Sequence, residues 1–304
     1  MRNLLLIVSI CSITFPFIAR SQDAQNATGW KNELQTGINF NQSSFSSNWK
    51  AGGVNALAIS GFINGKAELK QETYSFTNDL QLLYGNVQNE TQGLRKTADR
   101  IFFDSRYGYN LSKHWSVFAS VNFQTQFDAG YEYIKEKDAA GNETGVEIAT
   151  RISGFMSPGY LTQALGMEYK PVDYFSAQFG VGALRQSFVL DQTLYDVKQK
   201  DELYGVKKRD KIRNQTVFQF VANFDKEIMK NLVLKARYMG LADYEKLNGQ
   251  GIVHRLDANI TAKVNKYINV NLAGVLLYDA DQDADVQYSQ VMALGILYTF
   301  GGSK

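Results

Sequence analysis

The chain has 304 residues, of which 44% are hydrophobic and 20% charged, with 32 basic against 30 acidic side chains. Aromatic residues are frequent, at 19 Phe, 17 Tyr and 3 Trp, whereas proline occurs only 3 times. This composition excludes collagen-like and highly charged disordered chains. Because charge is balanced, the sequence also argues against a nucleic-acid partner, whose recognition needs clustered positive charge.

The first 21 residues are predicted to be a signal peptide. Arg2 supplies the positive start, Leu4 to Ile18 form an apolar run, and the small residues Ala19 and Ser21 precede the expected cleavage site. Residues 22–304 are then expected to form one domain. The only cysteine of the chain, Cys11, is removed with the leader, so the mature chain is expected to fold without disulfides.

Apolar and polar residues alternate with period two along most of the mature chain, which indicates β-strands. One strand, for example, has Ile101, Phe103 and Tyr107 on one face and Arg100, Asp104 and Arg106 on the other. The pattern predicts twelve strands, at residues 30–41, 54–64, 72–84, 100–110, 115–127, 160–170, 174–187, 214–225, 232–244, 252–264, 267–278 and 286–300.

Two architectures produce such alternation, a soluble β-sandwich or barrel and a transmembrane β-barrel. Four features favour the membrane barrel. The first three are long strands, an even strand count with connections that alternate between short and long, and aromatic residues near strand ends. The fourth is a long amphipathic last strand that ends on Tyr298-Thr299-Phe300. We therefore predict an all-β fold, a single transmembrane antiparallel barrel of about 12 strands, with short periplasmic turns and longer extracellular loops. With the signal peptide, this predicts the outer membrane of a Gram-negative bacterium.

Four local motifs look familiar in combination. They are Asn48-Trp49-Lys50-Ala51-Gly52-Gly53, Arg95-Lys96-Thr97-Ala98-Asp99-Arg100, Asn122-Phe123-Gln124-Thr125-Gln126-Phe127-Asp128-Ala129-Gly130-Tyr131 and Phe155-Met156-Ser157-Pro158-Gly159-Tyr160. Together they resemble a family of exported Bacteroidota proteins that is described only as a domain of unknown function. The resemblance extends from about Trp30 to Phe300 and implies an outer-membrane barrel without an assigned activity.

The motif residues fall on the outer loops or the strand ends beside them. They allow two interpretations. In the structural one, Gly52 and Gly53 let a loop turn while Lys96, Asp99 and Arg100 fix the loops by charge pairing. In the functional one, the loops form a docking surface or lid. The loop residues selected are Trp49, Gly52, Gly53, Arg95, Lys96, Asp99, Gln126, Gly130, Tyr131, Pro158, Gly159 and Tyr160.

The sequence offers little for catalysis. It has two histidines, His114 and His254, and shows neither a phosphate-binding glycine loop nor metal-ligand spacing. A twelve-stranded barrel that hydrolyses lipids would need a serine beside a histidine near the outer leaflet. The closest serine to His254 is Ser289, which lies two strands away in the expected order. We therefore expect no enzyme, no cofactor and no metal site. The acidic run Asp279 to Asp285 is interpreted as a solvated loop rather than a cation site.

Charges of both signs are expected to face the barrel lumen: Arg100, Asp104, Arg106, Glu168, Asp225, Lys235, Arg237, Arg255 and Asp257. Because opposite charges can pair across a bore of this size, we expect a narrow, charged lumen. Two functions stay open, a barrel that presents its loops to an envelope protein partner and a narrow channel for small solutes. Outer-membrane lipid is an expected partner, and the basic run Lys207 to Arg213 could contact lipopolysaccharide phosphates.

Overall fold

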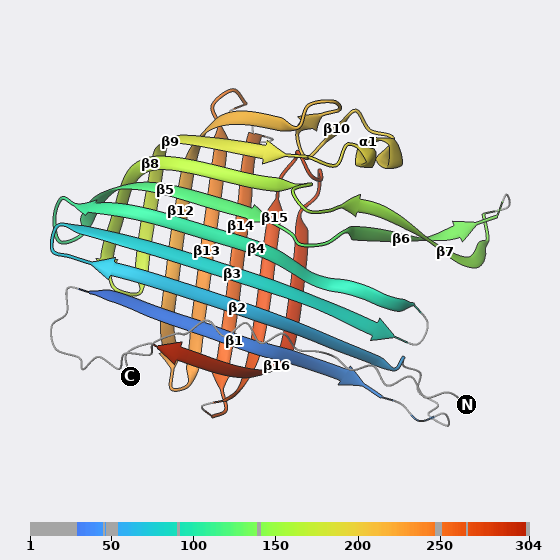
Figure 1. Cartoon of the computed structure of the whole chain (residues 1–304), viewed down its shortest axis with the longest axis horizontal. Helices are drawn as coiled ribbons and strands as arrows, with labels where there is room; N and C mark the ends of the chain where they lie inside the picture. The colour runs from blue at the N-terminus through green and yellow to red at the C-terminus, as the bar shows by residue number, and fades with distance from the viewer. Residues whose placement is uncertain are drawn as a thin grey trace, which may run out of the picture.

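The computed structural model describes residues 29–301 except 45, 47–53, 90, 91, 139, 140, 247–250 and 266. The predicted signal peptide and the motif residues Trp49, Gly52 and Gly53 lie outside the described residues. In the described part, twelve strands close into one antiparallel barrel (Figure 1). The order around the ring is β1, β16, β15, β14, β13, β12, β9, β8, β5, β4, β3, β2 and back to β1.

The twelve predicted strands are confirmed. Their bounds are β1 Trp30–Ser43, β2 Ala56–Lys70, β3 Tyr74–Asn89, β4 Gly93–Asn110, β5 Trp115–Thr125, β8 Gly159–Val172, β9 Phe175–Phe188, β12 Ile212–Met229, β13 Leu232–Asp243, β14 Ile252–Lys263, β15 Ile268–Tyr278 and β16 Gln287–Gly301. The connections β2–β3, β4–β5, β8–β9, β12–β13 and β14–β15 lie at one end of the barrel, which we call the turn end. The opposite end is called the loop end.

Two connections differ from the expectation. The segment expected to turn at residues 65–71 stays in β2 as far as Lys70, and the segment expected to be a long loop at 85–99 is a hairpin of β3 and β4 in which Asn89 faces Gly93. Gly93 has a φ of 71°, a value that glycine adopts without strain. The charged residues 95–100 look like a loop in sequence because the alternation there includes no apolar face, yet the backbone ladder continues through them.

The barrel closes through β1 and β16, which pair from Glu33↔Gly301 to Phe40↔Leu294. Closure matters because lipid offers no hydrogen-bond partner to a free sheet edge. The side chains follow the same requirement. Large apolar side chains on alternate positions are exposed on the outer wall, as with Leu294, Ile296 and Tyr298 of β16. The barrel thus presents an apolar exterior of the kind that faces lipid.

Rings pair near the turn end, where headgroup-level aromatics are expected. Trp115 and Tyr169 have ring centroids 4.7 Å apart, and Tyr174 and Phe224 lie 5.8 Å apart. In the described residues, no helix is long and apolar enough to cross a membrane.

The loop end carries two insertions. The first is a hairpin of β6 (Gly130–Lys137) and β7 (Glu143–Ser153), which projects away from the barrel (Figure 1). The second, between β9 and β12, contains α1 (Thr193–Lys198), β10 (Glu202–Leu203) and β11 (Val206–Lys207). A small core of its own holds this second insertion together, formed by Val189, Leu194, Tyr195, Leu203 and Val206.

The two insertions contact each other. The Tyr204 hydroxyl donates to the carbonyl of Ile152 in β7 at 2.8 Å, and burial raises the pKa of Tyr204 to about 12. Lys198 of α1 pairs with Glu132 of β6 at 3.0 Å, and Arg151 of β7 pairs with Asp191 at 2.9 Å. The two insertions therefore form one connected assembly, which we call the loop assembly.

A β-bulge where β8 meets β9 needs glycine. A Cβ on Gly166 would lie 2.0 Å from the carbonyl oxygen of Phe179 and 2.8 Å from the Cα of Gly180, both backbone atoms. At Gly182, a Cβ would meet no atom within 4 Å. The two glycines lie on adjacent strands, so they form a matched pair.

We predict that Gly166→Ala lowers the free energy of unfolding by about 1–3 kcal/mol, because the strands must separate locally to admit the methyl group. Gly182→Ala is expected to leave it within about 0.5 kcal/mol of the wild type, the range usual for surface changes. Urea unfolding in detergent micelles measures both. Equal stability of the two variants would contradict the close approach at the bulge.

Candidate functional site

The centre of the lumen contains an ion pair that spans the bore. Arg100 of β4 lies with its Nη1 3.7 Å from Oδ1 of Asp257 on β14. Five strands separate β4 from β14 in either direction around the ring: β5, β8, β9, β12 and β13 one way, and β3, β2, β1, β16 and β15 the other. The two residues therefore reach each other from opposite walls. Arg255, two residues before Asp257 on the same strand, holds that carboxylate with two contacts of 2.7 Å.

A second pair crosses beside the first. Arg237 of β13 lies 3.4 Å from Asp104 of β4, and Asn122 donates to the same carboxylate at 2.9 Å. Phe102 is buried between the two crossings, with the guanidinium carbons of Arg100 and Arg237 4.6 Å and 5.8 Å from its ring centroid. An aromatic face attracts cations, so this ring supports both arginines. We call Arg100, Asp104, Arg237, Arg255 and Asp257 the central cluster.

The other predicted lumen charges pair closer to the wall. Arg106 forms an ion pair with Glu168 of β8, which also accepts from Gln178 at 3.0 Å. Near the turn end, Lys235 pairs with Asp225 at 3.2 Å, with 59% of each side chain exposed. Ion pairs that are this exposed contribute little to stability. The nine predicted residues thus lie in four groups, two of which meet across the bore.

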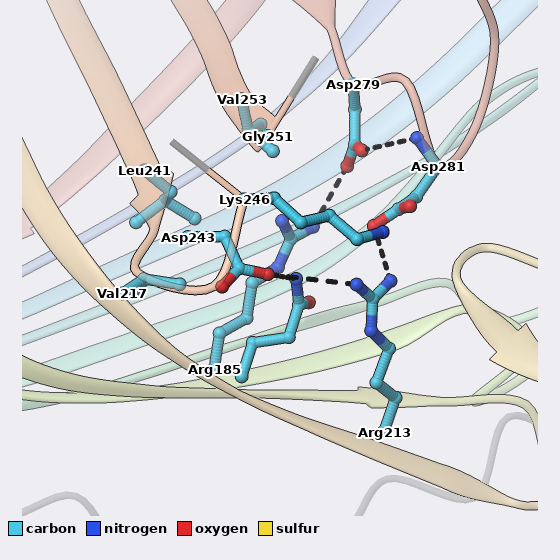
Figure 2. Close-up of a pocket in the computed structure, with 11 residues that line it drawn as sticks. Arg185, Arg213, Val217, Leu241, Asp243, Lys246, Gly251, Val253, Asp279 and Asp281 are labelled. Carbon is cyan, nitrogen blue, oxygen red and sulfur yellow. Dashed lines mark hydrogen bonds and ion pairs between the residues drawn. The ribbon is translucent and has the colours of Figure 1, made fainter. Parts of the chain in front are cut away.

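A further set of charges closes the loop end, and we call it the outer closure: Arg185, Arg213, Asp243, Asp279 and Asp281. Asp279 follows β15, yet its carboxylate is 3.0 Å from Arg185 on β9, with 2% and 8% of these side chains exposed. Asp281 of the same loop pairs with Arg213 of β12 at 2.6 Å (Figure 2). The loop between β15 and β16 is thereby drawn across the mouth to strands on another side of the ring.

Between these groups lies a cavity of about 20 Å³, which has room for about one water molecule. Gln215 borders it and donates to Asp243 at 2.8 Å. Arg213 approaches the same carboxylate at 3.8 Å. The three carboxylates are balanced by the two arginines together with Lys246, which also lines the cavity. The outer closure is therefore tightly paired rather than open for a ligand.

Sequence reasoning did not find the outer closure. The interpretation of the acidic run as a solvated loop was wrong for Asp279, which is buried, because its counter-ion comes from a distant strand. Alternation places Arg185 and Arg213 on the inward face of their strands, and this could have marked them as lumen charges. The alternation does not show which acidic residues they pair with.

The motif residues of β4 hold the root of the β6–β7 hairpin. Asp99 accepts the backbone N–H groups of Phe127 at 2.7 Å and Asp128 at 2.9 Å, and pairs with Lys96 at 2.7 Å. Higher on the same strand, Arg95 pairs with Glu147 of β7. Its guanidinium carbon also lies 4.0 Å above the ring of Tyr133 of β6. Arg100 was predicted both to face the lumen and, in the structural interpretation, to join this loop packing; it pairs with Asp257 in the lumen.

The remaining motif residues surround the same root. Gln126 donates to the carbonyl of Gly154 at 3.0 Å, and Gly130 faces Ser153 at the start of the hairpin. Tyr131 is exposed on β6. Thr125 donates to the carbonyl of Pro158 at 3.1 Å. Gly159 and Tyr160 begin β8, where the Tyr160 ring lies 4.7 Å below the guanidinium of Arg185. The structure thus brings the motifs 95–100, 122–131 and 155–160 together.

In the described structure, neither histidine has a hydrogen bond to a serine. Nδ1 of His114 is 3.2 Å from the carbonyl of Lys170 at the turn end, and Nδ1 of His254 is 2.7 Å from the Tyr238 hydroxyl on the outer wall. Among the described residues, no group of three or more His, Cys, Asp or Glu side chains is arranged to hold a metal ion.

The crossing pair predicts a measurable coupling. In a double-mutant cycle of Arg100→Gln and Asp257→Asn, we expect the two changes to be non-additive by about 1–3 kcal/mol, because each single change leaves a partly desolvated charge without its partner. The same cycle on Lys235→Gln and Asp225→Asn is the control, with an expected coupling under about 1 kcal/mol. Unfolding in detergent provides both values. A central coupling no larger than the control would mean that the bore separates the two charges.

The anchoring of the hairpin predicts a second effect. Asp99→Ala removes the acceptor of two backbone N–H groups at the hairpin root, so residues 126–158 are expected to open more often and to be cleaved faster by trypsin, by about tenfold or more. Asp196→Ala is the control, because its ion pair with Lys208 is exposed. A similar cleavage rate in both variants would remove Asp99 as the anchor.

Comparison with known proteins finds one family model that matches part of the chain. Residues 40–131 match the family model described as "Protein of unknown function (DUF3078)". This match agrees with the expected resemblance to a family of unknown function over a segment that contains the first three motifs. The segment is shorter than the expected range from 30 to 300. No curated protein matches the sequence.

Solved outer-membrane barrels are similar over most of their length. The translocator domain of autotransporter NalP from Neisseria meningitidis is 15% identical, covering 90% of each chain with a TM-score of 0.37. The NanC porin is 7% identical over 88% of this chain and 100% of its own, with a TM-score of 0.38. The COG4313 outer membrane channel from Pseudomonas putida F1 is 8% identical over 89% and 94%, with a TM-score of 0.36. Scores this low leave the function to be argued from the residues of this chain.

Proposed function

We propose that this protein is an outer-membrane β-barrel that keeps its lumen closed and presents its outer loops to an envelope protein partner. The single observation that carries the proposal is the ion pair between Arg100 and Asp257 on opposite walls of the ring. Where two side chains meet across the bore, they obstruct the path of a solute along the barrel axis. The barrel then serves to hold the loop assembly at the membrane surface, with short turns on the periplasmic side.

The β6–β7 hairpin is the part of the loop assembly best suited to a partner. Ile134, Val146 and Ile148 lie on one face of the hairpin and are exposed. Its opposite face is held to the barrel by Arg95. A two-stranded hairpin is marginal on its own in water, so the elaborate anchoring at its root supports a role for the exposed face. An exposed apolar face rimmed by polar residues is typical of a protein interface.

A second candidate function is a narrow channel for small solutes, and the outer closure favours it. The closure depends on one loop, through Asp279 and Asp281, rather than on the barrel wall. A loop can move aside, whereas the central cluster is built on the strands themselves. In neither candidate does the protein act as an enzyme or require a cofactor.

Single-channel recording separates the two functions. For the closed barrel, we expect the wild type and the variant Arg185→Gln with Asp279→Asn to show no conductance steps, because the central cluster still spans the bore. Arg100→Gln with Asp257→Asn is expected to raise conductance only in combination with the loop variant. Conductance in the wild type, or in the loop variant alone, would favour the channel.

The partner is tested by site-specific photo-crosslinking in cells. A photoreactive residue at position 134 or 148 of the hairpin is expected to capture one discrete envelope protein, and the same residue at position 113 at the turn end is the control. Equal products from both positions, or none from the hairpin, would contradict the docking role.

A further inference from the structure

The outer wall of the barrel has a groove, although a lipid-facing wall can be evenly covered by apolar side chains. Its volume is about 640 Å³ and it crosses the faces of β3, β4, β5, β8, β9 and β12. Large side chains border it, including Phe76, Tyr107 and Leu165, while Ala119, Gly182 and Thr216 leave it hollow. A Cβ on Gly182 would meet no atom within 4 Å, so the space there belongs to the groove and not to a packed neighbour.

Three amide side chains continue from the groove toward the loop end. Gln163, which lines the groove, donates to Gln186 at 3.3 Å, and Gln186 donates to Asn214 at 2.9 Å. They face outward, since the neighbouring residues Arg185 and Arg213 point into the barrel. We call these three the amide row. Polar side chains on a lipid-facing wall are costly away from the interface, so this row marks a level at which polar lipid groups are in reach.

The loop that leads into β12, on which Asn214 of the amide row lies, carries basic residues. Lys211 is three positions before Asn214, and Lys207 and Arg209 belong to the same loop. All three are exposed, and within the described residues none of them takes part in an ion pair within 4 Å. Asp210 lies among them and leaves an excess of two positive charges. Lys208 is engaged by Asp196 at 2.6 Å.

We propose that this wall is a binding site for an anionic lipid of the outer leaflet, with an acyl chain in the groove and its phosphate-bearing headgroup at the basic loop. The order of the three features matches the order of parts in such a lipid. The apolar groove accepts the chain, the amide row hydrogen-bonds to ester, amide or hydroxyl groups at the interface, and the exposed cations attract phosphate. The inference rests on the proposed membrane placement, and is independent of whether the lumen conducts.

The groove, the amide row and the basic loop together indicate which kind of molecule binds. An apolar peptide could fill the groove but would not need the amide row beside the basic loop. A free phosphate could bind the basic loop but would leave the groove unused. A phosphorylated acyl lipid uses all three, and the groove opens toward the membrane in which such lipids are already concentrated.

The test uses the purified, delipidated full-length protein in a zwitterionic detergent and lipid A as the probe, with binding measured by native mass spectrometry. Gly182→Phe is expected to fill the groove and weaken lipid A binding at least tenfold. Gly61→Phe places the same ring on the outer wall of β2, where a Cβ meets only the carbonyl of Gly37 at 4.0 Å, and is expected to bind like the wild type. Heat-modifiable migration in gels confirms that both variants are folded.

The headgroup is tested separately. Lys207→Gln with Arg209→Gln and Lys211→Gln is expected to weaken lipid A binding at least tenfold, whereas Lys113→Gln with Lys230→Gln and Lys263→Gln, at the turn end, is expected to change it less than twofold. Gln186→Leu is expected to weaken binding severalfold, because it breaks both hydrogen bonds of the amide row. Phosphatidylcholine is expected to compete poorly.

Three results would overturn the proposal. They are equal binding by Gly182→Phe and Gly61→Phe, equal competition by phosphatidylcholine and lipid A, and displacement of lipid A by inorganic phosphate alone at similar concentration. None of them bears on conductance or on capture by the hairpin, so a failure of the lipid site and a failure of the proposed function are distinguishable.

Discussion

A sheet that closes on itself inside lipid determines most of this structure. Closure gives the backbone N–H and C=O groups of both edge strands hydrogen-bond partners. It also divides the side chains into one set that faces lipid and one set that faces the lumen. Charges cannot remain on the lipid side, so the strands turn them inward. In a ring of twelve strands the inward charges come within reach of the opposite wall, and the central cluster results. The pairing of Arg100 with Asp257 is thus a consequence of ring size as much as of residue choice.

At the loop end, too, pairs of opposite charges hold separate parts of the chain together. Strand β4 extends past the end of its neighbour β5, and Asp99 and Arg95 use that extension to hold the β6–β7 hairpin. The outer closure adds ties between the loop after β15 and the strands β9 and β12. Loops that would otherwise move independently are joined by charge pairs to a rigid rim. We propose the docking role for this rim because exposed apolar side chains and anchored backbone coincide there.

The strands could be predicted from sequence because alternation is a local signal, and so could the inward direction of residues such as Arg106 and Asp257. The partners of those residues could not, because they depend on which strands lie opposite each other after closure. Asp279 illustrates the difference. Its place in an acidic run suggested solvent, and only the ring order brings Arg185 to it. The motif of residues 95–100 lies toward the loop end of the barrel, but it was expected in a loop, since its charges hide the strand to which they belong.

The pair of Arg100 and Asp257 also links early and late parts of the chain. Arg100 belongs to β4, whereas Asp257 belongs to β14, near the C-terminal end, and 157 positions separate them in sequence. Whatever the order in which the strands assemble, Arg100 has this counter-ion only once β4 and β14 face each other across the ring. The closed ring therefore has an ionic link across its diameter that an open curved sheet of the same strands would lack.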